Sequence, residues 1–139
     1  MALVYFHPGA LVRLCTPAAG SRVAAALWDG ADTVVTSRLA DLEVRAVLSG
    51  GLRIGKLDEG AVARARTRWG RLWLGLWTVE LGDELTARAA ELAELHPLRV
   101  TDAVHLASAL VLESPDLSVL SWDAPFSDAA RAEGLHVLP

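Results

Sequence analysis

Short apolar runs alternate along the chain with longer amphipathic stretches. Runs that are rich in branched or aromatic residues and bounded by turn residues predict short buried strands. Five such runs are present: Leu3–Phe6, Thr33–Thr36, Trp77–Leu81, Leu117–Trp122 and His136–Leu138. Continuous apolar runs are typical of parallel strands that are covered on both faces. The pattern therefore predicts a mainly parallel sheet of four to five strands.

The stretches between these runs carry the periodicity and the end signals of helices. The predicted N-caps are Ser21, Ser37, Asp58 and Thr101, and Pro8 and Pro125 suit first helical turns. We expect helices at about 22–29, 38–49, 58–76, 83–96, 102–113 and 125–134, and one more after Pro8. Because strands and helices alternate, the chain is predicted to be an α/β protein with helices on both faces of the sheet. No linker or repeat divides it, so residues 1–139 are expected to form a single domain.

Composition fits a packed globular protein, with 53% hydrophobic and 22% charged residues. The single cysteine, Cys15, cannot form an intramolecular disulfide, which favours a reducing compartment. The first residues lack the basic start of a secretory signal, and their apolar run is interrupted after Phe6 by His-Pro-Gly. No uncharged stretch is long enough to cross a membrane. We therefore expect a cytoplasmic protein that does not contact membranes.

Charge is unevenly distributed although its net value is only −4. Between Arg38 and Arg71 there are eight basic residues and four acidic ones, so the rest of the chain is strongly acidic. Such asymmetry is compatible with a face that binds a polyanion such as nucleic acid. It is equally compatible with a solvated helix surface held by ion pairs, and the charge pattern alone does not decide between the two.

Three acids and one histidine stand where a functional site is expected. His7 follows the first strand and Asp123 follows the strand of residues 117–122, while Asp102 begins a largely apolar helix. Glu43 lies one turn from Leu39, on a side of its helix expected to face the core, where a carboxylate needs a partner. Each acid also has a structural interpretation, as an edge residue, a helix-start acid or a turn residue.

Taken together, these positions indicate a common pocket. Ligands of parallel sheets bind beyond the carboxyl ends of the strands, where residues from distant segments converge. Oxygen ligands gathered there suit Mg²⁺ or Mn²⁺, ions that neutralise phosphate and activate water.

Four segments resemble the PIN-domain ribonucleases, in particular the VapC toxins of bacterial toxin–antitoxin pairs. These segments are "HPGALVRL", "SRLADLEVRAVL", "RVTDAVHLASAL" and "VLSWDAPFSDAARAEGLHVL". The resemblance implies a three-layer α/β/α sandwich and divalent-metal-dependent cleavage of RNA phosphodiester bonds. It places the family's acidic metal ligands and catalytic residues at Glu43, Asp102 and Asp123. The family's first aspartate corresponds to His7 and its motif serine to Gly9.

His7 changes the chemistry that the resemblance implies. An imidazole removes one negative charge and suits Mn²⁺ or another transition ion better than Mg²⁺. The site of His7, Asp102, Asp123 and Glu43 is therefore expected to hold a different metal or to be attenuated. Three explanations remain open: an enzyme with altered metal use, a catalytically silent PIN-fold module that binds an antitoxin or RNA and dimerises, and a variant disarmed for production.

Partners follow from the same resemblance. Arg38 and Arg45 lie on the helix of Glu43 and, with Arg13, are predicted to contact RNA phosphates. A VapB-like antitoxin is expected to lie across the acidic pocket, and a homodimer is expected because it is usual in the family. Tryptophans at and after the end of the helix of residues 58–76 are interpreted as core or subunit interface rather than base-stacking groups. His105 is interpreted as a pocket-wall or core residue. A response-regulator receiver is disfavoured, because the only lysine is Lys56.

Overall fold

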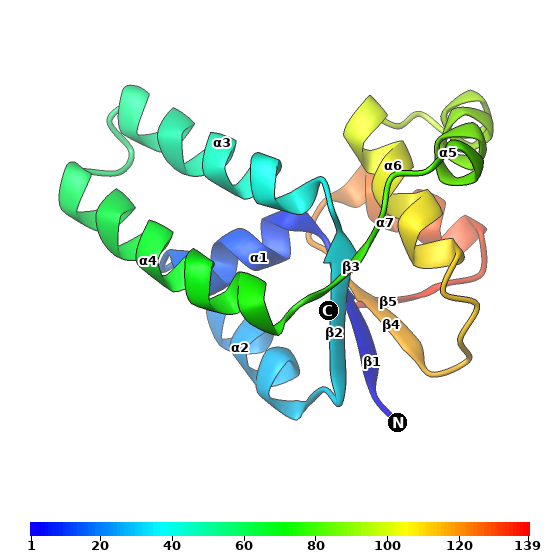
Figure 1. The fold of residues 1–139 in the computed structure, drawn as a ribbon, viewed down its shortest axis with the longest axis horizontal. Coiled ribbons are helices and arrows are strands. Elements are labelled where there is room, and N and C mark those ends of the chain that lie inside the picture. The colour runs from blue at the N-terminus through cyan, green and yellow to red at the C-terminus, as the bar shows by residue number, and fades with distance from the viewer.

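Five strands and seven helices follow one another in the predicted order in a computed structural model that describes residues 1–139 (Figure 1). The strands are β1 (Leu3–Phe6), β2 (Thr33–Ser37), β3 (Trp77–Val79), β4 (Leu117–Leu120) and β5 (His136–Leu138). The helices are α1 (Pro8–Cys15), α2 (Ser21–Gly30), α3 (Ala40–Arg53), α4 (Glu59–Gly75), α5 (Asp83–Leu95), α6 (Val100–Leu110) and α7 (Ala124–Ala132).

The strands form one fully parallel sheet in the order β3-β2-β1-β4-β5. The chain builds outward from β1 to β3 and then returns to the other side of β1 for β4 and β5. The order therefore reverses between β1 and β4, and ligands of such sheets bind beyond the carboxyl ends of the strands at this point. His7 follows β1 directly, and Asp123 lies three residues after the end of β4.

Helices cover both faces of the sheet, which confirms the three-layer α/β/α sandwich. Successive side chains of a strand point to opposite faces, so β1 supplies Tyr5 to one core and Val4 and Phe6 to the other. Helices α5, α6 and α7 build the first core, and α1 to α4 build the second. Figure 1 shows α3 and α4 on one side of the sheet and α5 to α7 on the other.

Two of the predicted strands are less buried than their composition suggested. The strand at Trp77 ends at Val79 rather than Leu81, and Trp77 is 72% exposed. His136 of β5 is also exposed. These two strands form the edges of the sheet, so the prediction that all five strands are buried on both faces is wrong for them. The strand that begins at Leu117 ends at Leu120 rather than at Trp122.

Helix starts agree with the predicted caps at Asp58 but not at three other positions. The Asp58 side chain accepts a hydrogen bond from the amide of Ala61. Ser37 ends β2, and α3 starts at Ala40. Similarly, α6 starts at Val100, before Thr101, and the N-cap of α2 is Gly20 rather than Ser21. The observed N-caps of these three helices, Gly20, Leu39 and Arg99, lie one or two residues from the predicted ones.

None of the helices combines the length and the apolar character that crossing a membrane requires.

Candidate active site

A cavity of about 340 Å³ opens beyond the carboxyl ends of the central strands. It brings together residues from the end of β1 into α1, from α3, from the start of α6 and from the loop after β4, as the topology predicts. The lining residues are His7, Pro8, Gly9, Arg13, Glu43, Val47, Arg99, Thr101, Asp102, Trp122 and Asp123. All four residues that the sequence assigned to the site therefore face one cavity.

His7 connects the first strand to the carboxylate of Asp102. It is the N-cap of α1, and its Nδ1 atom accepts a hydrogen bond from the amide of Gly9 at 3.2 Å. A backbone amide can only donate, so Nδ1 carries no proton and the proton of the neutral ring lies on Nε2. Nε2 then donates to Oδ1 of Asp102 at 2.9 Å. His7 is only 6% exposed, which fixes this orientation.

Asp102 lies in the first turn of α6 and is 2% exposed. Its Oδ1 accepts from His7, and its Oδ2 accepts from Nε of Arg99 at 3.0 Å. Burial by itself would raise the pKa of Asp102, but the hydrogen bonds from His7 and Arg99 outweigh burial and the pKa lies below its ordinary value. The carboxylate is therefore ionised at neutral pH despite its burial.

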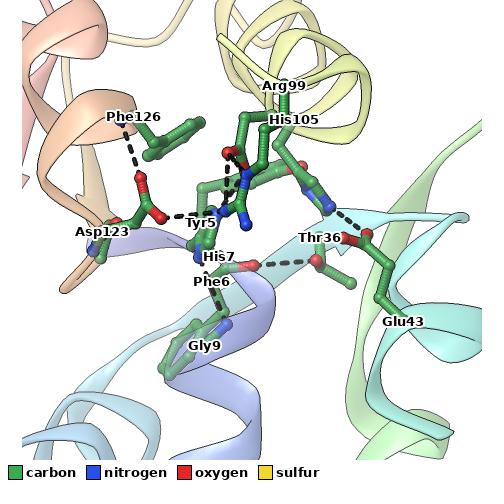
Figure 2. A network of polar contacts seen from close by, with 12 residues as sticks. Tyr5, Phe6, His7, Gly9, Thr36, Glu43, Arg99, His105, Asp123 and Phe126 are labelled. Carbon is green, nitrogen blue, oxygen red and sulfur yellow. Dashed lines mark hydrogen bonds and ion pairs between the residues drawn. The ribbon is translucent and has the colours of Figure 1, made fainter. Parts of the chain in front are cut away.

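Asp123 has two functions in the structure. Its Oδ1 accepts from the amide of Phe126 and caps α7, as a turn aspartate would. Its Oδ2 accepts from Nη2 of Arg99 at 3.0 Å. Figure 2 shows the guanidinium of Arg99 beside the Asp123 carboxylate, with the capping bond on its other side. The structural interpretation of Asp123 as a turn and capping residue is confirmed, and its assignment to the active site stays a prediction.

Glu43 reaches the cavity from the opposite layer and is held by His105. The buried residues of α3 are Ala40, Val44 and Leu48, so the predicted core stripe through Leu39 and Val47 is wrong. Both rows have helical spacing, and the buried row lies one residue after the predicted one. Glu43 lies at the edge of the true core stripe.

A buried chain of hydrogen bonds fixes the Glu43 carboxylate (Figure 2). Nε2 of His105 lies 2.5 Å from Oε1 of Glu43, and Nδ1 of His105 lies 2.7 Å from the hydroxyl of Tyr5. Burial raises the pKa of Tyr5, so the hydroxyl keeps its proton and donates to Nδ1, which leaves Nε2–H to donate to Glu43. His105 is fully buried, which confirms its interpretation as a core residue, and its contact with Glu43 was not predicted.

Of the three arginines predicted to contact RNA, only Arg13 lines the cavity. Its guanidinium lies 4.4 Å from the ring centroid of Trp122 and donates to the carbonyls of Ala19 and Gly9. Arg38 is paired with Glu80, and Arg45 is paired with Asp41.

Arg99 was missed by the sequence interpretation. Its one available signal was a basic residue three positions before a helix-start acid, the spacing of a helical ion pair.

The polar groups of the cavity do not fit a divalent ion as they are arranged here. Such an ion needs several lone pairs that point at one position, and no group of three or more His, Cys, Asp or Glu residues is arranged in this way. Both nitrogens of His7 and both oxygens of Asp102 already have partners. The geometry therefore does not support His7 as a metal ligand. The preference for a transition ion over Mg²⁺ depended on His7 as a ligand, so it is not supported either.

Comparison with known proteins identifies the class to which this fold and cavity belong. The PIN domain matches residues 9–132, most of the chain, so the chain belongs to the PIN-domain family. Two curated relatives from Mycobacterium tuberculosis are each 45% identical over 139 residues, which cover 100% of this chain and 96% of the relative. They are ribonuclease VapC45 of strain CDC 1551 / Oshkosh and ribonuclease VapC49 of strain ATCC 25618 / H37Rv. Ribonucleases of this family generally depend on divalent metal ions.

Solved structures show the same fold at low sequence identity. VapBC2 from Rickettsia felis, bound to a DNA fragment from its promoter, has a TM-score of 0.67 at 12% identity and covers 98% of this chain and 97% of its own. A toxin–antitoxin complex from Klebsiella pneumoniae has a TM-score of 0.63 at 19% identity, with coverage of 100% and 97%. FitAcB from Neisseria gonorrhoeae has a TM-score of 0.60 at 15% identity, with coverage of 98% and 96%.

Proposed function

We propose that this chain is an endoribonuclease that cleaves RNA phosphodiester bonds and acts as the toxin of a VapC-type toxin–antitoxin pair. The observation that carries the proposal is the single cavity that collects Glu43, Asp102 and Asp123 with the cationic Arg13 and Arg99. Its position beyond the carboxyl ends of β1 and β4 is where a fold of this topology binds its ligand. The family relationship to ribonucleases agrees with this chemistry.

Different residues of the cavity are proposed to bind the phosphodiester and to transfer a proton. Arg13 and Arg99 supply the positive charge that a phosphodiester needs. Oε1 of Glu43 accepts a hydrogen bond from His105, and Oε2 has no protein partner. Oε2 is therefore our candidate to accept a proton from the attacking group. Asp102 and Asp123 hold Arg99 and face the same space. His7 is a positioning residue that fixes Asp102.

A second candidate function is favoured by one observation. Both oxygens of Asp102 already accept hydrogen bonds, from His7 and Arg99, so the central carboxylate of the cavity is satisfied by the protein itself. A chain in this state can bind RNA or an antitoxin without cleaving. The alternative is therefore a catalytically silent PIN-fold binding module.

Comparison of the natural chain with His7→Asp separates these functions. We expect the natural chain to cleave a mixed RNA substrate. The substitution replaces a hydrogen-bond donor to Asp102 by a second carboxylate, and we expect the variant to cleave the same substrate at least as fast. The assay is run in Mg²⁺, in Mn²⁺ and in EDTA, and product lengths are read on denaturing gels.

Each pattern of activity has one interpretation. A silent natural chain with an active His7→Asp variant supports the binding module. If neither protein cleaves RNA under any of these conditions, the nuclease proposal is wrong.

We further propose that the antitoxin lies along a row of three cavities. The largest, about 710 Å³, lies between α2 and α4 and combines Arg64 and Arg71 with apolar groups and a single acid, Asp29. A cavity of about 420 Å³ shares Arg68 with it and Arg13 with the active-site cavity. This lining suits an acidic peptide with an apolar side. A charge-reversed Arg64→Glu/Arg71→Glu chain should lose co-purification with the product of a neighbouring small reading frame, whereas Arg131→Glu should retain it.

The expected homodimer stays a prediction. Exposed apolar side chains such as Leu74, Trp77 and Leu81 offer a surface that a second copy can cover.

A further inference from the structure

Arg99 occupies the space between the two aspartates of the active-site cavity. It precedes α6 as its N-cap residue, and its Nη2 atom lies 2.9 Å from Oδ2 of Asp102 and 3.0 Å from Oδ2 of Asp123. Nε adds a second bond to Asp102 at 3.0 Å. One guanidinium therefore bridges two carboxylates that come from different elements of the fold.

Arg99 pairs with the one oxygen of each aspartate that no other protein group holds. The other oxygen of Asp102 accepts from His7, and the other oxygen of Asp123 caps α7 through the amide of Phe126. Oδ2 of each aspartate is therefore the atom that remains for an external cation. Both of these atoms are paired with Arg99.

Arg99 is the solvent-exposed member of this cluster. Its side chain is 71% exposed, whereas that of Asp102 is 3% exposed. An arginine is always charged and carries a planar set of donors that matches carboxylates, but ion pairs with an exposed partner are weak and readily exchanged. Each aspartate is also held by a second group, His7 or the Phe126 amide, whereas Arg99 is the exposed member of both ion pairs.

We propose that Arg99 is a resident cation of this cavity that competes with divalent ions for Asp102 and Asp123. The proposal deepens the proposed function and rests on it, because the same two carboxylates form the active site. Divalent ions reach Oδ2 of both aspartates only when the guanidinium swings toward solvent. The chain therefore binds divalent ions more weakly than its three acidic side chains alone would.

The affinity for Mn²⁺, measured by calorimetric titration or by the electron paramagnetic resonance of the free ion, tests this proposal. Arg99→Gln removes the charge and keeps a polar side chain of intermediate length. We expect it to bind Mn²⁺ at least tenfold more tightly than the natural chain. Arg131→Gln, which removes an exposed arginine paired with Asp128 on α7, should bind Mn²⁺ as the natural chain does.

A double variant, Arg99→Gln/Asp102→Asn, locates the effect. Loss of the tighter binding in this variant supports competition at Asp102, whereas tighter binding that persists in it overturns the proposal. An Arg99→Gln chain that binds Mn²⁺ no more tightly than the natural chain also overturns it.

RNA cleavage is assayed separately in all of these proteins. If the affinity rises but no protein cleaves RNA, the resident cation stands and the nuclease function fails. If the natural chain cleaves RNA and Arg99→Gln leaves the Mn²⁺ affinity unchanged, the nuclease function stands and the resident cation fails.

Discussion

Asp102→Asn should lower the rate of RNA cleavage by about 100-fold or more, the usual scale for losing one part of a preorganised electrostatic site. The substitution keeps the shape of the side chain and removes its charge. Because Asp102 is the most buried carboxylate of the cavity and holds both His7 and Arg99, the charge balance of the site depends on it. Initial rates on one RNA substrate, with the fold checked by circular dichroism, give the measurement.

Two further variants make this result interpretable. Asp123→Asn should also lose activity strongly while it still caps α7, since the asparagine oxygen can accept from Phe126. Asp116→Asn changes an exposed acid in the loop before β4 that pairs only with the chain terminus, and it should cleave RNA at the natural rate. Full activity in folded Asp102→Asn would show that the chemistry takes place elsewhere.

Trp69→Ala should lower the free energy of unfolding by about 3–5 kcal/mol, the range measured for removal of large aromatic side chains from protein cores. Trp69 is 1% exposed in the core formed by α1 to α4. Its Nε1 also donates to Oδ1 of Asp41 at 2.8 Å. A loss of this size is a large part of the stability of a typical domain. Denaturation with urea, followed by far-ultraviolet circular dichroism, measures it.

Trp77→Ala is the matched control, because Trp77 is 72% exposed on the edge strand β3. We expect it to change the free energy of unfolding by less than about 0.5 kcal/mol in the monomer. Equal losses in the two variants would contradict the assignment of Trp69 to the core and of Trp77 to the surface.

Local patterns in the sequence were sufficient for the architecture. Each strand is a short apolar run, and the rule that ligands bind beyond the carboxyl ends of parallel strands was enough to group His7, Asp102 and Asp123. The tryptophans of the predicted helix 58–76 were interpreted as core or subunit interface, and Trp69 is a core residue. These features depend on neighbours in the sequence and on chain direction, which are both readable from the residues.

Pairings across layers were not readable in the same way. The bond from His105 to Glu43 joins α6 on one face of the sheet to α3 on the other, and no local pattern specifies it. Arg99 differs from the other arginines only in where its side chain lies. The misplaced stripe on α3 shows a related limit. Two neighbouring rows of side chains both have helical spacing there, and tertiary packing decides which row is buried.

The proposed function requires that RNA binds the protein at the cavity of His7, Asp102 and Asp123. Photocrosslinking of a 4-thiouridine RNA to the cleavage-deficient Asp102→Asn chain, followed by tryptic mapping, tests this claim directly. We predict crosslinks in the peptide of residues 100–131, which contains Trp122 of the cavity wall, and in residues 1–13. Crosslinks confined to residues 57–88, on α4 and the edge of the sheet, would contradict it.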